Sequence, residues 1–284
     1  MDTLIKKFFP KIVIQSRELI TNGWESDILI INKQQVFRFP KQNNRFDIVY
    51  DKEKTITDTI RPFLTTPITK MDIYREGIFK KKILFSLLDY IDGIDYENSD
   101  KPDITTDLVC FLKELHSIDV KIFKNYEKLN AVNLPFYKYK LTLDNLPFEY
   151  DTLSPLLKKY DLEQDFNDCI KIFTNFEWDD KDNVICHNDL HQGNIMVKDG
   201  KITGIIDFGD TIYTNYNVEF VSILKWKDSN ILKNIIGVYE KETGRKIDIK
   251  FIIAVLKLQT YLKLNFKNDD EKYLNRLKNL ENKI

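Results

Sequence analysis

The chain has 284 residues, of which 43% are hydrophobic and 31% charged, a balance that favours a globular protein with a sizeable core. A formal net charge of −1 excludes a strong overall attraction to nucleic acid. No apolar run approaches the roughly 18 residues that cross a membrane, and three cysteines without paired spacing indicate neither disulfides nor a zinc site. We therefore expect a cytoplasmic protein, a monomer or weak dimer, that binds neither nucleic acid nor membrane.

The first ninety residues carry strand patterns around one helical stretch. An apolar run at 28–31 is followed by four polar residues and then by a second strand-like stretch at 36–39, which Pro40 ends; this pattern predicts a β-hairpin. A helix is expected over about 48–60 and another strand over about 83–91. This part of the chain is therefore expected to be strand-rich.

Beyond Gly93 the hydrophobic pattern becomes helical. Thr105 or Thr106 is expected to cap the first helix, and His116 to pack or cap at its end. A β-rich island over 184–208 interrupts the helical pattern. Further helices are expected at about 151–176, 217–228, 229–242, 248–267 and 270–282.

A strand-rich front followed by a helical back with one β island predicts an α+β fold of two lobes. We expect the N-terminal, nucleotide-binding lobe to comprise residues 1–92, including the connector, and the helical lobe to comprise 93–284. A cleft between two lobes is a usual place for a ligand.

The β island contains two polar segments, HNDLHQGN at 187–194 and IDFGD at 206–210. A hairpin between their strands would bring Asn194 close to Asp207, and oxygen ligands of this kind suit Mg²⁺. Phosphoryl transfer needs such a cation, a positioned nucleophile and neutralised charge. These residues predict that Asn194 and Asp207 hold Mg²⁺, while Asp189 accepts or orients the proton of an attacking hydroxyl.

In this order and spacing, the two segments resemble the aminoglycoside phosphotransferase family, relatives of the protein kinases. His187 lies two residues before the catalytic acid, as in the H-R-D-x-x-x-x-N loop, and residues 207–209 match D-F-G. F-R-F-P at 37–40, together with I-D-F-G-D, is most similar to the 2''-aminoglycoside phosphotransferases. The resemblance covers about residues 20–225 and implies a bilobal protein-kinase-like fold, Mg²⁺ as cofactor and ATP or GTP as phosphate donor.

The resemblance also implies how the phosphates are held. Residues 36–40 match the family strand V-F-[KR]-F-P, so Arg38 stands in the place of the phosphate-binding lysine, with Lys41 as a possible substitute. Glu53, on the following helix, is then the acid that holds this cation. Residues 22–27, Asn-Gly-Trp-Glu-Ser-Asp, depart from the G-x-G-x-x-G loop of protein kinases and resemble small-molecule kinases instead.

Residues 88–93 resemble the connector whose main-chain groups pair with the purine of the nucleotide. This resemblance implies that Asp89 and Ile91 take part in nucleotide binding. Ile206, just before the metal-binding acid, would line the base pocket. Glu219 matches an acid that buttresses the catalytic loop in this family.

Charge gives two opposing indications about the acceptor. Segment 144–182 holds eleven acids and four lysines, which favours a small cationic acceptor such as an aminoglycoside. In the 2''-aminoglycoside kinases that this chain resembles, acids after the helix that follows D-F-G contact substrate amines. Here that stretch, 224–228, contains two lysines, so Asp228 and Asp210 are the remaining candidates for acceptor contacts.

Two alternatives to an aminoglycoside kinase stay open. A kinase of another small hydroxyl compound (macrolide, choline-like, homoserine-like or sugar-amine) would share every residue named above. A non-catalytic nucleotide-binding module is suggested by Arg38 and the missing glycine-rich loop, although Asp189, Asn194 and Asp207 are all retained.

Overall fold

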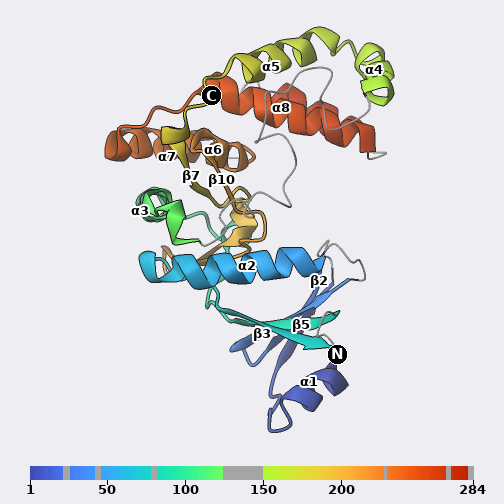
Figure 1. Cartoon of the computed structure of the whole chain (residues 1–284), viewed down its shortest axis with the longest axis vertical. Helices are drawn as coiled ribbons and strands as arrows, with labels where there is room; N and C mark the ends of the chain where they lie inside the picture. Colours follow the sequence, from blue (N-terminus) through green and yellow to red (C-terminus); the bar gives the residue numbers. More distant parts are fainter. Residues whose placement is uncertain are drawn as a thin grey trace.

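An antiparallel sheet of five strands forms the N-terminal part of the molecule, with strand order β1-β2-β3-β5-β4 (Figure 1). The computed structural model describes residues 1–21, 26–41, 46–77, 82–123, 150–226, 229–266 and 270–280. The strands of this sheet are β1 (Arg17–Ile20), β2 (Ser26–Ile31), β3 (Gln35–Pro40), β4 (Met71–Glu76) and β5 (Lys82–Asp89).

The predicted hairpin is confirmed as β2 and β3, with Leu29 opposite Phe37. Its turn contains Asn32 and Lys33, both with positive φ. Asparagine tolerates this conformation, and the Asn32 side chain also accepts N–H groups of the preceding segment, including that of Ser16 at 3.0 Å. The polar turn residues therefore fix the register of the hairpin.

Two helices cover opposite faces of the sheet, as Figure 1 shows with α1 below it and α2 above it. The helix α1 (Asp2–Phe8), which sequence patterns did not predict, adds Ile5 to a core with Phe37 and Phe85. The helix α2 (Phe46–Ile60) confirms the expected helix and places Tyr50 on the other face. Its C-terminal half enters the core of the helical lobe through Ile56 and Ile60, so α2 joins the two lobes.

The remaining helices pack around one large apolar core. They are α3 (Thr105–Ser117), α4 (Tyr150–Lys159), α5 (Glu163–Asn175), α6 (Asn217–Ile223), α7 (Ser229–Thr243), α8 (Ile249–Phe266) and α9 (Asp270–Leu280). Within the described ranges, none of the helices has the length and apolar character that a membrane span requires.

Three expectations about helix ends were wrong. Thr105 is the first helical residue rather than the cap, and its main-chain N–H is accepted by Asp103 at 3.0 Å. The helix expected over 151–176 is broken at Asp161, which has a φ of 55°. The helix expected over 217–228 ends at Ile223, because tighter turns follow it.

The predicted β island forms two small sheets within the helical lobe. The strands β8 (Ile195–Lys198) and β9 (Lys201–Ile205) form the expected hairpin, with β6 (Ile94–Asp95) along its other edge. The strands β7 (Asn183–Cys186) and β10 (Ile212–Asn215) pair separately. Because β5 ends at Asp89 and β6 begins at Ile94, we propose that the lobe boundary lies after residue 92.

Candidate active site

The loop between β7 and β8 presents Asp189 beside Asn194. The Asn194 side-chain nitrogen donates to the Asp189 main-chain oxygen at 2.9 Å and lies 3.5 Å from its carboxylate. Because the amide nitrogen is used in this way, the amide oxygen of Asn194 is left for another partner. His191 Nε2 lies 3.6 Å from the same Asp189 carboxylate.

A buried glutamate accepts hydrogen bonds from the main chain of this loop. Glu219, on α6, is fully buried, and its carboxylate accepts the main-chain N–H groups of His187 at 2.6 Å and Asn188 at 3.1 Å. Two charge-assisted bonds to consecutive N–H groups fix the direction of the backbone just before Asp189. The predicted buttressing role of Glu219 is confirmed. His116 Nε2, also buried, lies 3.7 Å from the same carboxylate.

The hairpin β8–β9 brings Asp207 to Asn194, as the sequence predicts. Ile206 donates its main-chain N–H to the Asn194 carbonyl at 3.0 Å, and the Ile206 carbonyl lies 3.0 Å from Nε2 of His187. Asp207 itself has a φ of 67°, a left-handed conformation that is sparsely populated by residues other than glycine. Such backbone outliers cluster at functional sites. The two candidate metal ligands thus lie at the same end of one hairpin, Asn194 just before β8 and Asp207 just after β9.

Arg38 and Glu53 form a buried ion pair between β3 and α2. Their side chains are only 14% and 1% exposed, and Arg38 contacts the carboxylate through both terminal nitrogens. The guanidinium also lies 4.4 Å from the ring centroid of Tyr50. Burial raises the pKa of Glu53, and the charge of Arg38 opposes that shift. Lys41 does not share this position, because it pairs with Asp27 at 3.3 Å.

The helix α2 lies directly against the loop that follows Asp207. A side-chain carbon at Gly209 would lie 3.2 Å from Val49 and 4.0 Å from the Glu53 carboxylate. The main-chain N–H of Phe208 faces the Glu53 carboxylate and acts to lower its pKa. A side chain at Gly209 would be tighter against Val49 than an ordinary contact, so a residue larger than glycine requires Val49 to shift by a few tenths of an ångström. The Arg38–Glu53 ion pair of the N-terminal lobe therefore lies close to the loop that follows Asp207, the candidate metal ligand of the helical lobe.

Sequence reasoning missed Lys52, which precedes Glu53 on α2. Lys52 is 8% exposed, and its Nζ has no hydrogen-bond partner in the described structure. Burial lowers its pKa to about 8, while the carboxylates of Asp210 and Glu53 oppose the shift. The only signal in the sequence is a lysine beside the predicted acid, and helical spacing alone does not reveal its burial.

Asp210 lies among the acids of the centre. More than a third of the residue is exposed, yet the groups crowded around its carboxyl exclude enough water to raise its pKa, and Asp189 and Asp207 act in the same direction. Its main-chain carbonyl accepts the side-chain N–H of Asn188 at 3.1 Å. Asp210 is therefore at the centre, as predicted, whereas Asp228 lies outside the described residues.

The residues predicted to lie near the nucleotide base include Asp89, the last residue of β5, and Ile91, which follows that strand. Asp89 is exposed and pairs with Gln35 at the end of the β3–β5 ladder. Ile91 lies against Gly204 of β9, where an added side-chain carbon would come within 2.5 Å of it. The structure therefore brings Ile91 to the hairpin that precedes Asp207, and leaves Asp89 at the end of β5, an internal strand of the sheet. The loop 22–25 falls outside the described residues.

The turn after α6 packs on the candidate catalytic loop. Ser222 donates its hydroxyl to the Asn188 carbonyl at 2.7 Å, and the Trp226 indole donates to the Leu190 carbonyl at 3.1 Å. Lys225 stands between these two anchors and is half-buried. This turn therefore carries a lysine in the stretch where the resemblance leads one to expect acids.

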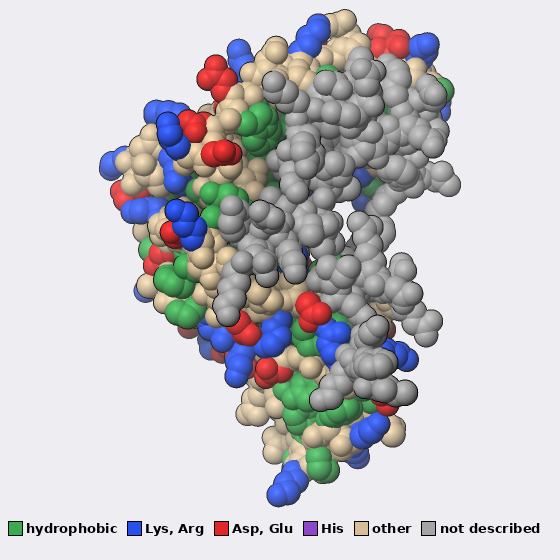
Figure 2. All heavy atoms as spheres, viewed as in Figure 1, with side chains coloured by type: hydrophobic (Ala, Val, Ile, Leu, Met, Phe, Trp, Pro, Cys, Tyr) green, Lys and Arg blue, Asp and Glu red, His purple; other side chains and the backbone are tan. Residues whose placement is uncertain are grey.

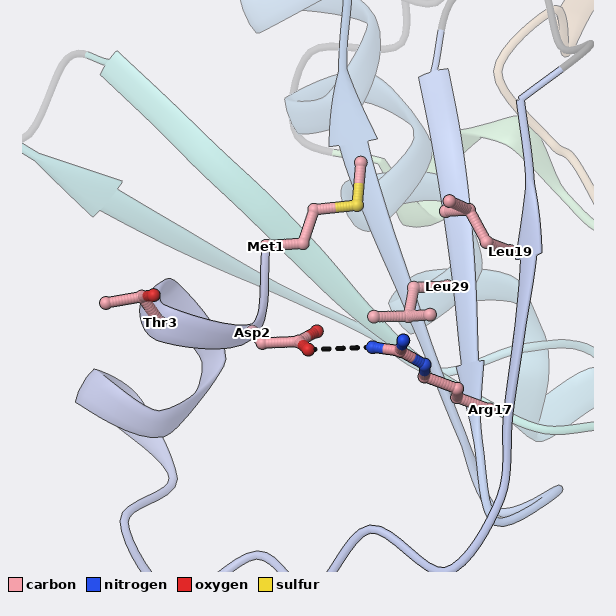
Figure 3. A pocket seen from close by; sticks show the side chains of 6 residues that line it. All are labelled: Met1, Asp2, Thr3, Arg17, Leu19 and Leu29. Carbon is pink, nitrogen blue, oxygen red and sulfur yellow. Dashed lines mark hydrogen bonds and ion pairs between the residues drawn. The ribbon is translucent and has the colours of Figure 1, made fainter.

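Two other features lie away from this centre. His116, Cys186 and Glu219 each present one potential ligand atom within 4.8 Å of the others, in a fully buried position behind the loop. A hollow of about 580 Å³ lies beside α1 and is crossed by the Asp2–Arg17 ion pair of 2.8 Å (Figure 3). Its lining consists of Met1, Asp2, Thr3, Arg17, Leu19 and Leu29.

A model of a known protein family matches the part of the chain that contains this site. The model described as the phosphotransferase enzyme family matches residues 63–247, which include the loop, the hairpin and Glu219. The chain belongs to this family. The match begins after Arg38 and Glu53 and covers β4, β5, the connector and most of the helical lobe, so the ion pair is independent structural evidence.

Solved structures of phosphotransferases have the same fold. A complex of GDP and kanamycin with APH(2'')-IIIa is 18% identical, with a TM-score of 0.69 over 99% of this chain and 97% of that one. ADP-bound APH(2'')-Ib is 20% identical, with a TM-score of 0.62 over 99% and 97%. A macrolide 2'-phosphotransferase from Brachybacterium faecium is 12% identical, with a TM-score of 0.59 over 93% and 92%. The predicted α+β bilobal kinase-like fold is confirmed.

The centre has a donor set that fits a magnesium ion. Asn194 offers an amide oxygen and Asp207 a carboxylate, and a hairpin brings both to one place. Hard oxygen ligands in this small number are typical of Mg²⁺, which keeps waters and phosphate oxygens as its other ligands. The residues present therefore fit this cofactor.

Proposed function

We propose that the protein transfers the γ-phosphate of ATP or GTP to a hydroxyl group of a small molecule, in the cytoplasm. The observation that carries this proposal is the bonding of Asn194 to Asp189 on one side and to the strand leading into Asp207 on the other. A base and two metal ligands in one rigid unit are what phosphoryl transfer needs. Membership of the phosphotransferase family supports the same chemistry.

In this reaction the acceptor hydroxyl oxygen forms a bond to the γ-phosphorus, and the bond from that phosphorus to the bridging oxygen of the β-phosphate breaks. The nucleoside diphosphate leaves, and the hydroxyl proton passes to the carboxylate of Asp189. Asn194 and Asp207 would hold Mg²⁺, which neutralises charge on the phosphates when bound. Arg38, fixed by Glu53, would contact the donor phosphates, and Ile91 and Ile206 would line the base pocket together with Asp89.

The acceptor hypothesis from sequence is an aminoglycoside, with antibiotic resistance as the consequence. Neighbouring structures named for aminoglycosides support it, including a complex with kanamycin. The acidic segment supports it less, because several of its acids pair internally: Asp165 with Lys257 at 2.7 Å and Asp168 with Lys171 at 3.2 Å. On the face drawn in Figure 2, acidic and basic side chains are interspersed.

A coupled assay of nucleotide consumption tests the proposal, with ATP and GTP run separately in the presence of Mg²⁺. The acceptors are kanamycin, erythromycin, choline, homoserine and glucosamine. Asp189→Ala serves as the matched control. Acceptor-dependent consumption by the natural protein, absent from the variant, is the expected result. Equal nucleotide consumption by both proteins with every acceptor would contradict the proposed role of Asp189.

A further inference from the structure

His116 is a buried titratable group that the proposed reaction does not use. It lies near the C-terminal end of α3, is 5% exposed, and stands between polar groups of two other helices. Its Nδ1 lies 2.8 Å from the hydroxyl of Tyr239 on α7. Its other ring nitrogen, Nε2, lies 3.7 Å from the carboxylate of Glu219 on α6. The imidazole therefore connects α7, through α3, to the glutamate that binds the loop of Asp189.

The hydroxyl of Tyr239 determines which nitrogen of His116 carries the proton. Arg245, just beyond α7, directs Nη1 at the same hydroxyl from 3.5 Å, and an arginine side chain can only donate. The Tyr239 oxygen therefore accepts from Arg245, which leaves its own hydrogen for Nδ1 of His116. A ring nitrogen that accepts a hydrogen bond carries no proton, so the proton of the neutral ring is on Nε2.

The contact with Glu219 leads to the same assignment. An unprotonated Nε2 would turn its lone pair towards a fully buried carboxylate, which is unfavourable, whereas an N–H presents its positive end to that charge. Among the described residues Nε2 has no closer hydrogen-bond partner, so Glu219 is the negative group that it faces. Burial lowers the pKa of His116, and Glu219 opposes this shift, so the ring is neutral at pH 7.

We propose that His116 is a positioning residue for phosphoryl transfer, a neutral imidazole whose Nε2–H holds the Glu219 carboxylate against the loop of Asp189. This inference rests on the proposed phosphotransferase function. The carboxylate binds the main-chain N–H groups of His187 and Asn188, and the dipole of Nε2–H helps to fix its orientation from α3. Because a displacement of about 1 Å can cost roughly 100-fold in rate, a change in this orientation affects the candidate base.

The first test determines the tautomer of His116 in the natural protein by nitrogen NMR of the imidazole rings at pH 7. The chain has 3 histidines, so the signal of His116 is assigned by its loss in His116→Gln. We expect a neutral ring with the proton on Nε2. A proton on Nδ1, or a doubly protonated ring, overturns the proposal whether or not any variant folds. A metal ion bound to Nε2 overturns it as well, because a ligating nitrogen carries no proton.

The second test compares His116→Gln, His116→Asn and His116→Met. The amide nitrogen of glutamine reaches the place of Nε2 and that of asparagine the place of Nδ1, while methionine supplies no N–H. We expect His116→Met and His116→Asn to lower kcat about tenfold to a hundredfold and to leave the nucleotide Kd in EDTA unchanged. His116→Gln should recover most of the rate.

Tyr261→Phe is the matched control for a weakened helical lobe. It removes a buried hydroxyl that donates to Asp165, away from the loop of Asp189. Urea unfolding should show a loss of stability in this variant, while its kcat stays that of the natural protein. The control separates a general loss of packing from a specific effect on the candidate base.

The third test asks whether His116 acts through Glu219. His116→Met is combined with Glu219→Gln, which keeps the shape of the side chain and removes its charge. In the Glu219→Gln background the imidazole has no carboxylate to hold, so adding His116→Met should change kcat by less than about twofold. Effects on kcat that multiply as for independent sites overturn the proposal.

The contrary results are distinguishable from a failure of the proposed function. Equal kcat in His116→Gln and His116→Asn overturns the positioning role while transfer itself remains. A loss of stability in His116→Met with the natural kcat leaves His116 a packing role alone and overturns the proposal too. A folded protein that consumes neither ATP nor GTP with any acceptor contradicts the phosphotransferase function instead, and the NMR measurement still decides the tautomer.

Discussion

The side-chain nitrogen of Asn194 lies 2.9 Å from the main-chain oxygen of Asp189, so a candidate metal ligand braces the candidate base. The two proposed roles are therefore separable only by substitutions that spare this bond. Asp189 can be changed at its side chain without touching its carbonyl, whereas any change of Asn194 affects both residues.

Replacing Asp189 with alanine should abolish transfer while leaving nucleotide binding nearly intact. Loss of a general base costs about 10²- to 10⁴-fold in rate, and Asp189 is not a proposed ligand of the nucleotide. Steady-state transfer and calorimetric binding of the Mg²⁺–nucleotide complex are the two measurements. Asp199→Ala in the turn between β8 and β9 is the control. Transfer at the natural rate in Asp189→Ala would refute the assigned role.

Asp207→Ala should lose nucleotide binding that depends on Mg²⁺. The carboxylate is one of two proposed oxygen ligands, so its removal leaves too few protein ligands for the ion. Nucleotide Kd is measured across a Mg²⁺ titration and again with EDTA. We expect the gap between the two conditions to close in the variant and to persist in Asp199→Asn. An unchanged Mg²⁺ dependence in Asp207→Ala would exclude this residue as a ligand.

Arg38→Ala should lower the free energy of unfolding by about 3–5 kcal/mol, because it leaves the buried Glu53 carboxylate without a cation. Arg38→Lys restores a charge but not the planar fork, so it should fold and bind nucleotide more weakly. Urea unfolding and nucleotide Kd check the two statements. Arg17→Ala is a matched control, since its ion pair with Asp2 is exposed and is worth at most about 1 kcal/mol. Equal losses in the two alanine variants would contradict the buried-pair argument.

Lys52→Met should stabilise the protein at pH 7. The folded-state pKa of Lys52 is lowered to about 8, below its usual 10.5, so the unfolded chain binds more protons between these values. The free energy of unfolding of the natural protein therefore rises as the pH rises from about 8 to 10.5. Below pH 8 the buried charge of Lys52 costs its full amount, about 3 kcal/mol.

Urea unfolding of both proteins at pH 7, 8, 9 and 9.5 measures this difference, which should shrink with rising pH. Lys54→Met is the neighbouring control, because Lys54 already pairs with Asp58 at 2.7 Å. A difference between Lys52→Met and the natural protein that does not vary with pH would show that Lys52 is not buried in its charged form.

Much of the fold and of the site was predictable where local chemistry decides the structure. The hairpins ending at Pro40 and Asp207 follow from turn residues and strand patterns, and Glu219 follows from family spacing. The helix α1 was missed because its seven residues gain their stability from packing against Phe37 and Phe85, which are distant in sequence. Lys52 was missed for the same reason, since only tertiary contacts bury it.

The bonds from Glu219 and Ser222 to the loop of Asp189 have a consequence for how new specificities arise in this protein. Both residues stand on α6, and the turn with Lys225 continues directly from that helix. The loop of the candidate base Asp189 and the turn with Lys225 are therefore fixed to the same helix. We expect a mutation that tilts α6 to displace Asp189 as well. Exchanging side chains on the turn would instead leave the backbone around Asp189 in place.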